Sequence, residues 1–368
     1  MAAMTADSNS CTSMKKILVF GAGVLGSLYA GKLCQAGYDV TILARGQRLE
    51  ELRRHDLVLV EDGSSQVETI PVPVTDRLLP GDAYDLILVI VRKNQLPTVL
   101  PALAANTASP NVLFLVNNAE GPEPLVKALG TQRVLLGFPG AGGQREAGIV
   151  RYKLTRASTQ PTTIGELDGS PSGRIARIAG VLGEAGFPIA VSENMDAWLK
   201  THVALVSPIA NALYLAGGNN YRLAHTRDGL VLMIRALKEG LRVLLRLHIP
   251  ITPAKYRLLL WIPEPILVAV LQKSLDTPQA ELVLARHANA ARDEMRTLAE
   301  EFRALAHKSG ELTPAIDALA CYLNPDYPIL PEGQAKIKLG WGSIIAAGGT
   351  VVFFGLLINW LQSQRRHS

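Results

Sequence analysis

Residues 15–26 read Lys-Lys-Ile-Leu-Val-Phe-Gly-Ala-Gly-Val-Leu-Gly, and this stretch decides the fold. Four consecutive apolar residues, Ile17 to Phe20, suit a strand that is buried on both faces of a parallel sheet. A Gly-x-Gly-x-x-Gly motif follows at once, then a helical pattern over 27–36 and a further strand over 39–43. This order of elements predicts a dinucleotide-binding unit. The alternative is a glycine-rich turn that binds nothing.

Each glycine of this loop has a physical role. Gly21 permits the tight turn from strand to helix, Gly23 lets a pyrophosphate approach the backbone, and Gly26 lets the helix pack close to the strand. The start of the helix then offers free N–H groups and a positive dipole end to the phosphates. We therefore predict that the whole loop binds the cofactor: Gly21, Ala22, Gly23, Val24, Leu25 and Gly26.

Arginines follow the second strand, where an NAD-binding unit usually places a carboxylate for the ribose 2′-hydroxyl. The sequence there is Leu-Ala-Arg-Gly-Gln-Arg, with Arg45 and Arg48. A guanidinium pairs with a 2′-phosphate, which a carboxylate would repel. The sequence therefore favours NADP(H), with Arg45 as its ligand. The alternative is a solvated arginine face on the helix expected over 47–54.

The rest of the first half alternates strands with helices. Apolar runs at 85–91, 111–116 and 134–138 indicate further buried strands, whose carboxyl ends mark the edge where such sheets bind ligands. Residues 57–74 suggest small antiparallel strands around a turn at 61–63. We predict an α/β fold, with a Rossmann-like, doubly wound parallel sheet over 15–190. From about Ser192 the apolar residues recur at helical spacing, which predicts an all-α domain over 191–323.

The C-terminal segment differs from the rest of the chain in its composition. Residues 324–343 are rich in proline and indicate an extended linker. Residues 344–361 carry no charge and would span about 27 Å as a helix, close to the ~30 Å hydrocarbon core of a bilayer. Trp341 and Trp360 flank this run, and the mean hydropathy of the chain is +0.19. We predict a transmembrane anchor over 344–361; the alternative is an apolar helix buried in a dimer interface.

The bulk composition fits a two-domain enzyme. The chain has 368 residues, 48% of them apolar, and a net charge of +5. Its few aromatic residues are not interleaved with a basic stripe, which argues against nucleic-acid binding. The scattered cysteines, Cys11, Cys34 and Cys321, indicate a reducing cytoplasmic compartment. Residues 1–14 lack the apolar core of a secretory signal, and we predict a disordered lead with an alternative start at Met14.

Three motifs resemble those of the ketopantoate reductase (2-dehydropantoate 2-reductase) family, and they occur in the same order as in that family. Residues 16–46 look very like the opening of that family, the loop at 117–121 resembles its Asn-Gly-x-Gly loop, and residues 197–200 resemble its Trp-x-Lys signature. The resemblance covers about 15–323. It implies a Rossmann domain and a helical domain like that of 6-phosphogluconate dehydrogenase, with NADPH and substrate meeting between them. It also implies a role in pantothenate biosynthesis, and we expect a homodimer.

The resemblance assigns roles to single residues. Lys200 matches the catalytic lysine, which would donate a proton to the ketone oxygen. Asn118 matches an asparagine that orients substrate or nicotinamide ribose; the alternative is a loop asparagine in a turn. Glu294 matches a glutamate near the cofactor ribose, although its neighbours differ from the family pattern, and an exposed charged helix face is the alternative. Arg92 stands in place of a family lysine, and Gln95 is kept, so both are predicted at the cofactor.

Departures from the family concern the substrate side. Two family asparagines that follow the lysine are replaced by Ala204 and Pro208, and Leu282 and Val283 stand near the place of a family serine. On a helix, Lys200 shares a face with Ser207 and Asn211, which we predict as replacement substrate ligands. The loss of polar anchors points to a different or less polar substrate.

His202 and His225 lack partners at metal-ligand spacing, so we predict no metal. The sequence as a whole predicts an NADPH-dependent reductase of a 2-oxo acid or related ketone, with Lys200 as general acid. Its catalytic domains would be cytoplasmic and attached to a membrane through residues 344–361. The alternative is a membrane-tethered NADPH-binding sensor or scaffold without turnover.

Overall fold

The computed structural model of this chain describes residues 14–340. The expected lead over 1–14 and the expected anchor over 344–361 therefore lie, but for Met14, outside the described residues. The described residues form two compact units, one from residues 14–117 and 122–195, the other from 118–121 and 196–340. The sequence places this boundary at 190/191 and assigns the loop at 118–121 to the first domain, whereas by its contacts this loop belongs to the second unit.

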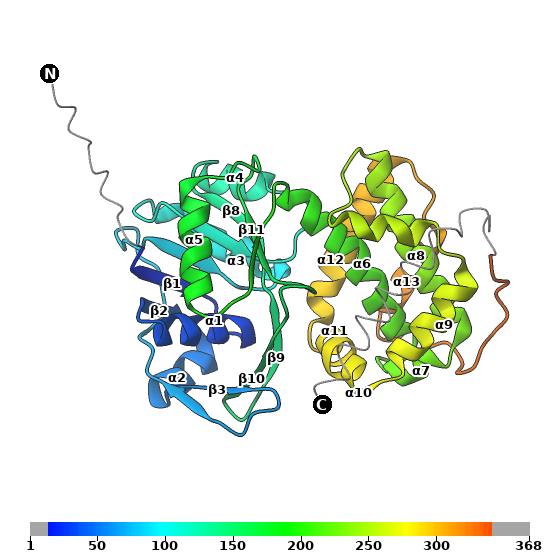
Figure 1. Cartoon of the computed structure of the whole chain (residues 1–368), viewed down its shortest axis with the longest axis horizontal. Helices are drawn as coiled ribbons and strands as arrows, with labels where there is room; N and C mark the ends of the chain where they lie inside the picture. The colour runs from blue at the N-terminus through cyan, green and yellow to red at the C-terminus, as the bar shows by residue number, and fades with distance from the viewer. Residues whose placement is uncertain (1–13, 341–368) are drawn as a thin grey trace, which may run out of the picture. The chain divides into compact units, whose positions relative to one another are not determined.

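A mostly parallel sheet forms the centre of the first unit (Figure 1). Its strands within residues 14–340 are β1 (Lys16–Phe20), β2 (Asp39–Leu43), β5 (Val74–Thr75), β6 (Leu86–Val89), β7 (Val112–Leu115), β8 (Val134–Phe138), β11 (Thr162–Gly165) and β12 (Ile189–Val191). Their order is β12-β11-β8-β7-β6-β1-β2-β5, and all neighbours are parallel except β8 and β11. The order reverses between β1 and β6, which is the switch point where open α/β sheets bind ligands.

Helices connect these strands. They are α1 (Val24–Gln35), α2 (Gly46–Arg54), η1 (Lys93–Gln95), α3 (Leu96–Ala105), α4 (Glu123–Leu129) and α5 (Gly173–Glu184). α1 contacts α5, and α3 contacts α4. The apolar residues of β1, β6 and β7 are almost fully buried, as the uninterrupted apolar runs of the sequence predict.

A second sheet in the first unit packs on α1. Its strands are β3 (Leu57–Glu61), β4 (Glu68–Ile70), β9 (Ala141–Glu146) and β10 (Ile149–Leu154), in the order β4-β3-β10-β9. The antiparallel pair β3–β4 confirms the prediction for 57–74, whereas the hairpin β9–β10 was not predicted. Ala147 and Gly148 form its two-residue turn, both with positive φ. Strand β3 packs closely against α1, since a Cβ on Gly31 of α1 would lie 2.7 Å from the side chain of Leu59.

The second unit is helical, as the sequence predicts. Its helices within the described residues are α6 (Met195–Leu215), α7 (Asn220–Ala224), α8 (Arg227–Arg246), η2 (Ala254–Leu260), α9 (Glu264–Leu275), α10 (Pro278–Ala280), η3 (Glu281–Ala285), α11 (Arg286–Ala290), α12 (Arg292–Ser309), α13 (Pro314–Ala320) and η4 (Cys321–Leu323). Buried side chains of α6, α8, α12 and α13 form one apolar core.

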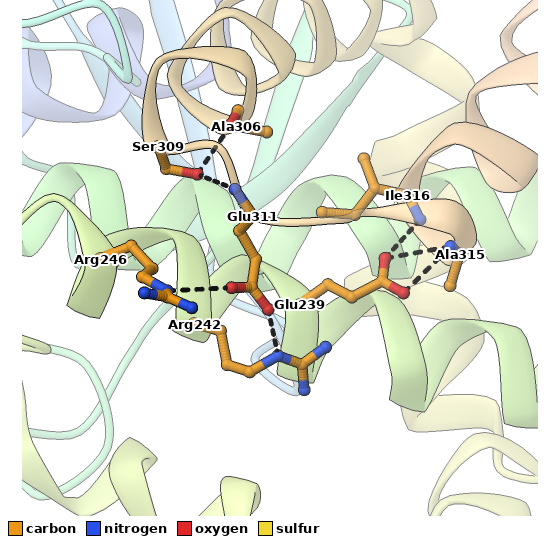
Figure 2. A network of polar contacts seen from close by, with 8 residues as sticks. All are labelled: Glu239, Arg242, Arg246, Ala306, Ser309, Glu311, Ala315 and Ile316. Carbon is orange, nitrogen blue, oxygen red and sulfur yellow. Dashed lines mark hydrogen bonds and ion pairs between the residues drawn. The ribbon is translucent and has the colours of Figure 1, made fainter.

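Two glutamates fasten the α12–α13 connection to α8 (Figure 2). The buried carboxylate of Glu239 accepts hydrogen bonds from the backbone N–H groups of Ala315 (3.0 Å) and Ile316 (2.9 Å) and so caps α13. Burial raises the pKa of Glu239, although these N–H donors oppose the shift. Glu311 forms an ion pair with Arg242 of α8 at 2.7 Å. These contacts hold α13 against α8 through charge-assisted hydrogen bonds.

Between residues 14 and 340, no unbroken helix has both the length and the apolar composition for a membrane span. The pair η2 and α9 meets these criteria only when taken together, and it bends by 120°.

Candidate functional site

The glycine loop joins β1 to α1 in the first unit. Gly21 has φ +118°, and a Cβ at this position would lie 2.3 Å from the carbonyl oxygen of Ile90. A Cβ on Gly26 would lie 1.9 Å from the carbonyl oxygen of Gly21. A Cβ on Gly23, by contrast, would meet nothing within 4 Å. Gly21 and Gly26 are therefore required by the turn itself, whereas Gly23 leaves its side of the loop open.

The N-terminus of α1 suits an anion. Its N-cap is Gly23, no side chain caps the helix, and its first turn holds no acidic residue. The first helical residues, Val24 and Leu25, leave N–H groups without partners inside the helix. Both the unpaired N–H groups and the positive end of the helix dipole favour a phosphate here. The loop thus fits the pyrophosphate of a dinucleotide, which is the group that the motif implies.

Arg48 reaches from α2 back to this loop. Its Nε donates to the carbonyl oxygen of Ala22 (3.3 Å), its Nη2 to Oγ of Ser27 (3.1 Å), and its Nη1 to Glu51 (3.2 Å). Burial lowers the pKa of Arg48. Because its side chain is only 11% exposed, Arg48 does not belong to a solvated arginine face.

Arg45 is exposed at the N-cap of α2, and its guanidinium lies 5.8 Å from the ring centroid of Phe20. It comes directly after β2, at the carboxyl edge of the parallel sheet. The exposed position leaves both interpretations of Arg45 open, as a phosphate ligand or as a solvated charge.

Arg92 and Gln95 follow β6, on the other side of the switch point. The Gln95 side chain accepts a hydrogen bond from the backbone N–H of Arg92 (3.2 Å) and so closes the short helix η1. The neighbouring Lys93 is buried, a property that the sequence did not indicate.

Lys200 lies on α6 in the second unit and is only 8% exposed. Its ammonium group donates to the carboxylate of Asp196, one helical turn earlier. A buried ammonium needs such a partner, because desolvation of an unpaired charge is costly. The pair therefore holds a proton donor in a fixed position on α6.

Trp198 and His202, each two residues from Lys200 in the sequence, stack on each other. Their ring centroids are 5.4 Å apart, and the ring planes differ by 9°. Burial lowers the pKa of His202 to about 4, and His287 adds to this shift. His202 is therefore neutral near pH 7, so Lys200 has no cationic imidazole two residues away.

Asn118 closes its own loop. Its Oδ1 accepts from the N–H of Gly121 (3.2 Å), and its Nδ2 donates to the carbonyl oxygen of Gly121 (2.8 Å). Glu301 of α12 accepts from the N–H groups of Ala119 and Glu120, each at 3.1 Å. These bonds tie the loop at 118–121 to the helical unit. The turn that the sequence offered as the alternative for Asn118 is thus present, and a role toward substrate remains a prediction.

Ser207 and Asn211 are both buried on α6. They line a cavity of about 10 Å³ with Pro208, Ala299, Phe302, Ile316 and Leu319. This volume is about the smallest that holds one water molecule. Oδ1 of Asn211 is buried without a hydrogen-bond partner among the described residues.

Glu294, in the first turn of α12, is 6% exposed. The exposed helix face, which the sequence left as the alternative for Glu294, is therefore wrong.

Among residues 14–340, no three His, Cys, Asp or Glu side chains are arranged to hold a metal ion. His225 contacts the carbonyl oxygen of Tyr221 at 2.8 Å and the carboxylate of Asp276 at 3.7 Å.

Sequence comparison gives the family. The family model "Ketopantoate reductase PanE/ApbA" matches residues 17–169. The 2-dehydropantoate 2-reductase of Archaeoglobus fulgidus is 30% identical over 239 residues, which cover 64% of this chain and 75% of that protein. The chain belongs to the ketopantoate reductase family. It is therefore a member of an oxidoreductase family. The Pyrococcus horikoshii 2-dehydropantoate 2-reductase is 26% identical over 63% of this chain and 74% of its own length.

Solved structures share the fold of this family member. A 2-dehydropantoate 2-reductase from Geobacter metallireducens superposes with a TM-score of 0.66 at 18% identity, over 83% of this chain and 98% of that one. A D-mandelate dehydrogenase with NADH and anilino(oxo)acetate gives 0.67 at 18% identity, over 84% and 97% of the two chains.

Sequence reasoning missed two acidic residues of this ketopantoate reductase family member, Asp196 and Glu301. Asp196 precedes Lys200 by four residues, so helical spacing alone signals the pair. Glu301 contacts a loop 181 positions earlier in the chain, and no local pattern signals that contact.

Proposed function

We propose that this chain is an NADPH-dependent reductase of a 2-oxo acid or related ketone, with Lys200 as general acid. The observation that carries the proposal is the ion pair on α6 between the buried Lys200 and the partly exposed Asp196, in a member of this oxidoreductase family. Reduction of a ketone requires a proton on the oxygen as hydride reaches the carbon. An ammonium group held in place by a carboxylate is suited to that donation.

The cofactor side of the reaction belongs to the first unit. Gly21, Gly23 and Gly26 with the N-terminus of α1 would hold the pyrophosphate, and Arg45 the 2′-phosphate. When bound, NADPH supplies the hydride. The absence of a carboxylate directly after β2, in the run Leu-Ala-Arg, supports NADP(H) over NAD(H).

Other residues take positioning roles in the proposal. Arg92 and Gln95 would contact the cofactor at the carboxyl end of β6, and Glu294 would accept hydrogen bonds from the cofactor ribose. Asn118, in a loop that Glu301 holds by two backbone N–H groups, would orient the reactants. Each role rests on the alignment with the family pattern, from which Arg92 and the neighbours of Glu294 depart.

The substrate side differs from the family pattern, so we propose a 2-oxo acid less polar than 2-dehydropantoate. Ala204 and Pro208 replace two asparagines of the family pattern, and neither side chain offers a hydrogen bond. Ser207 and Asn211 are the nearby polar groups that we propose as ligands. Oδ1 of Asn211, which has no hydrogen-bond partner among residues 14–340, supports this role, because a buried acceptor without a donor is costly.

The test is a panel of 2-oxo acids, 2-dehydropantoate included, assayed for NADPH oxidation. Lys200→Ala should lower kcat at least about 100-fold while NADPH still binds, because general-acid catalysis contributes about 10²–10⁴-fold. Lys308→Ala, at an exposed lysine of the same unit, is the matched control and should keep full activity. Full activity of Lys200→Ala would exclude the catalytic role. NADPH binding without turnover across the panel would favour a sensor instead.

A further inference from the structure

The C-terminal strap, defined as residues 331–340, is fixed along the helical unit beside α8 and α9 (Figure 1). The carboxylate of Asp228, in the first turn of α8, accepts hydrogen bonds from the N–H groups of Lys336 (2.8 Å) and Ile337 (2.9 Å). Asp228 itself is fully buried. The segment that the sequence predicts as an extended linker is thus, up to residue 340, part of the helical unit.

The strap ends at a defined point. The N–H of Gly340 donates to Oε2 of Glu264, the first residue of α9, at 2.7 Å. Arg235 of α8 pairs with the same carboxylate at 2.8 Å and also donates to the carbonyl oxygen of Lys338, again at 2.8 Å. The chain therefore leaves the described structure beside the N-terminus of α9.

An apolar and basic surface lies in the segment that directly precedes α9 in the sequence. The Trp261 face, defined as Lys255, Arg257, Leu258 and Trp261, is exposed; Trp261 is 68% exposed and Leu258 45%. The next residue, Ile262, is buried, and its carbonyl oxygen accepts from Lys238 at 2.6 Å. The anchoring of Ile262 holds the preceding indole in its outward position.

Chain length ties this face to the apolar run that follows the strap. Trp261 precedes Glu264 by three residues, and Glu264 binds Gly340. The uncharged run over 344–361 begins four residues after Gly340, which a chain spans in at most about 14 Å. The Trp261 face thus lies within a few residues' reach of the start of that run.

We propose that the Trp261 face rests on the surface of a lipid bilayer that contains anionic lipids, while residues 344–361 insert into it. Tryptophan and basic side chains are the residues that occupy the membrane–water interface. Lys336 and Lys338 of the strap, which ends beside Glu264, are also exposed and add two further cations near the N-terminus of α9. Like charges oppose the pairing of this face with a second copy of itself, whereas anionic headgroups attract it.

The experiment measures the depth of Trp261 in the full chain. Trp341→Phe and Trp360→Phe leave Trp198, which is buried, and Trp261 as fluorophores. With vesicles of brominated phosphatidylcholine and phosphatidylserine, we expect most of the Trp261 emission to be quenched. The same protein with Trp261→Phe gives the Trp198 background. Emission of Trp261 that stays unquenched on vesicle-bound protein would overturn the proposal, as would failure to bind any vesicle.

Charge reversal tests the basic part of the face. Lys255→Glu with Arg257→Glu should weaken the phosphatidylserine-dependent part of binding at least about tenfold, because each cation near an anionic surface adds about a factor of five. Lys308→Glu, at an exposed lysine outside the face, is the control and should have little effect. Equal effects of the two charge reversals would contradict the proposal. A dimer that buries Trp261 in lipid-free solution would assign the face to a second copy instead.

Discussion

At the scale of single residues, the glycine loop could be read from the sequence because its requirements are local. Gly21 must adopt a positive φ, and Gly26 must approach the backbone of Gly21, so both needs are met within six residues of chain. Arg48 was harder to interpret. The sequence set it beside Arg45 as an arginine suited to a 2′-phosphate, with a solvated helix face as the alternative, yet its side chain donates to Ala22 and Ser27 of the β1–α1 segment. Tertiary packing decided its role, and no pattern in the sequence shows that packing.

Replacement of Arg45 tests the preference for NADPH. Arg45→Ala should raise the Kd for NADPH about tenfold or more and leave the Kd for NADH nearly unchanged, because a charge-assisted hydrogen bond contributes about 1.5–3 kcal/mol. Titration of both cofactors by fluorescence measures this. Arg54→Ala, at a 72% exposed arginine of the same helix, is the matched control. Equal losses for NADPH and NADH would exclude a 2′-phosphate role for Arg45.

The position of the first missing asparagine offers a second test. Ala204 is fully buried, and a Cβ on Gly240 of α8 would lie 3.3 Å from the Ala204 side chain. Ala204→Asn restores the family residue but inserts a larger polar group between two packed helices. We expect a loss of about 1–3 kcal/mol in the free energy of unfolding, measured by urea denaturation, without a gain in activity toward 2-dehydropantoate. Leu312→Asn, at an 83% exposed position, should change stability little. A stable and more active Ala204→Asn variant would contradict this account.

At the scale of elements, long apolar runs predicted the strands of the parallel sheet well. β2 and β8 match the predicted ranges, and β6 and β7 lie within them. The hairpin β9–β10 was missed because its first strand, Ala-Gly-Gly-Gln-Arg-Glu, has neither an apolar run nor alternation. It forms because β10 pairs with β3 on one side and β9 on the other. Pairing between segments 90 residues apart, rather than local propensity, creates this sheet.

Acid should release the C-terminal strap. Hydrogen bonds from strap N–H groups and the pairing with Arg235 hold the pKa values of Asp228 and Glu264 below their ordinary values. A carboxyl whose folded-state pKa is lowered stabilises the fold above its unfolded-state pKa, and this contribution is lost as pH falls through the folded value. We therefore expect the protection factors of the Lys336, Ile337 and Gly340 amides, taken against the intrinsic exchange rate at each pH, to fall below about pH 4. In Glu264→Gln, the protection of Gly340 should already be low at pH 7, and its pH dependence should be weaker. Unchanged protection of Gly340 in Glu264→Gln would contradict the assignment.

At the scale of the whole molecule, apolar residues begin to recur at helical spacing near Ser192. This change located the junction of the two units to within a few residues of Met195. The sequence could not show that residues 118–121 join the helical unit, because Glu301, which holds them, lies far along the chain. Nor could a proline-rich composition show that residues 331–340 are bound, since Asp228 and Glu264 supply the partners from α8 and α9. Polar contacts between segments that are distant in the sequence are thus the part of this structure that could not be predicted from the sequence.

The strap is bound to the helical unit up to Gly340, before the run over 344–361 begins, so the chain can be truncated between the two. A chain that ends at Gly340 keeps every hydrogen bond that Asp228 and Glu264 make to the strap. We expect it to retain the melting temperature and the NADPH-dependent activity of the full chain, because the apolar cores and the candidate site residues described above all lie before residue 341. Its partition into vesicles should fall by orders of magnitude, because an 18-residue apolar segment inserts far more strongly than an interfacial patch binds. Flotation of both chains on phosphatidylserine-containing vesicles measures this, and equal partition of the two chains would show that residues 344–361 are not a membrane anchor.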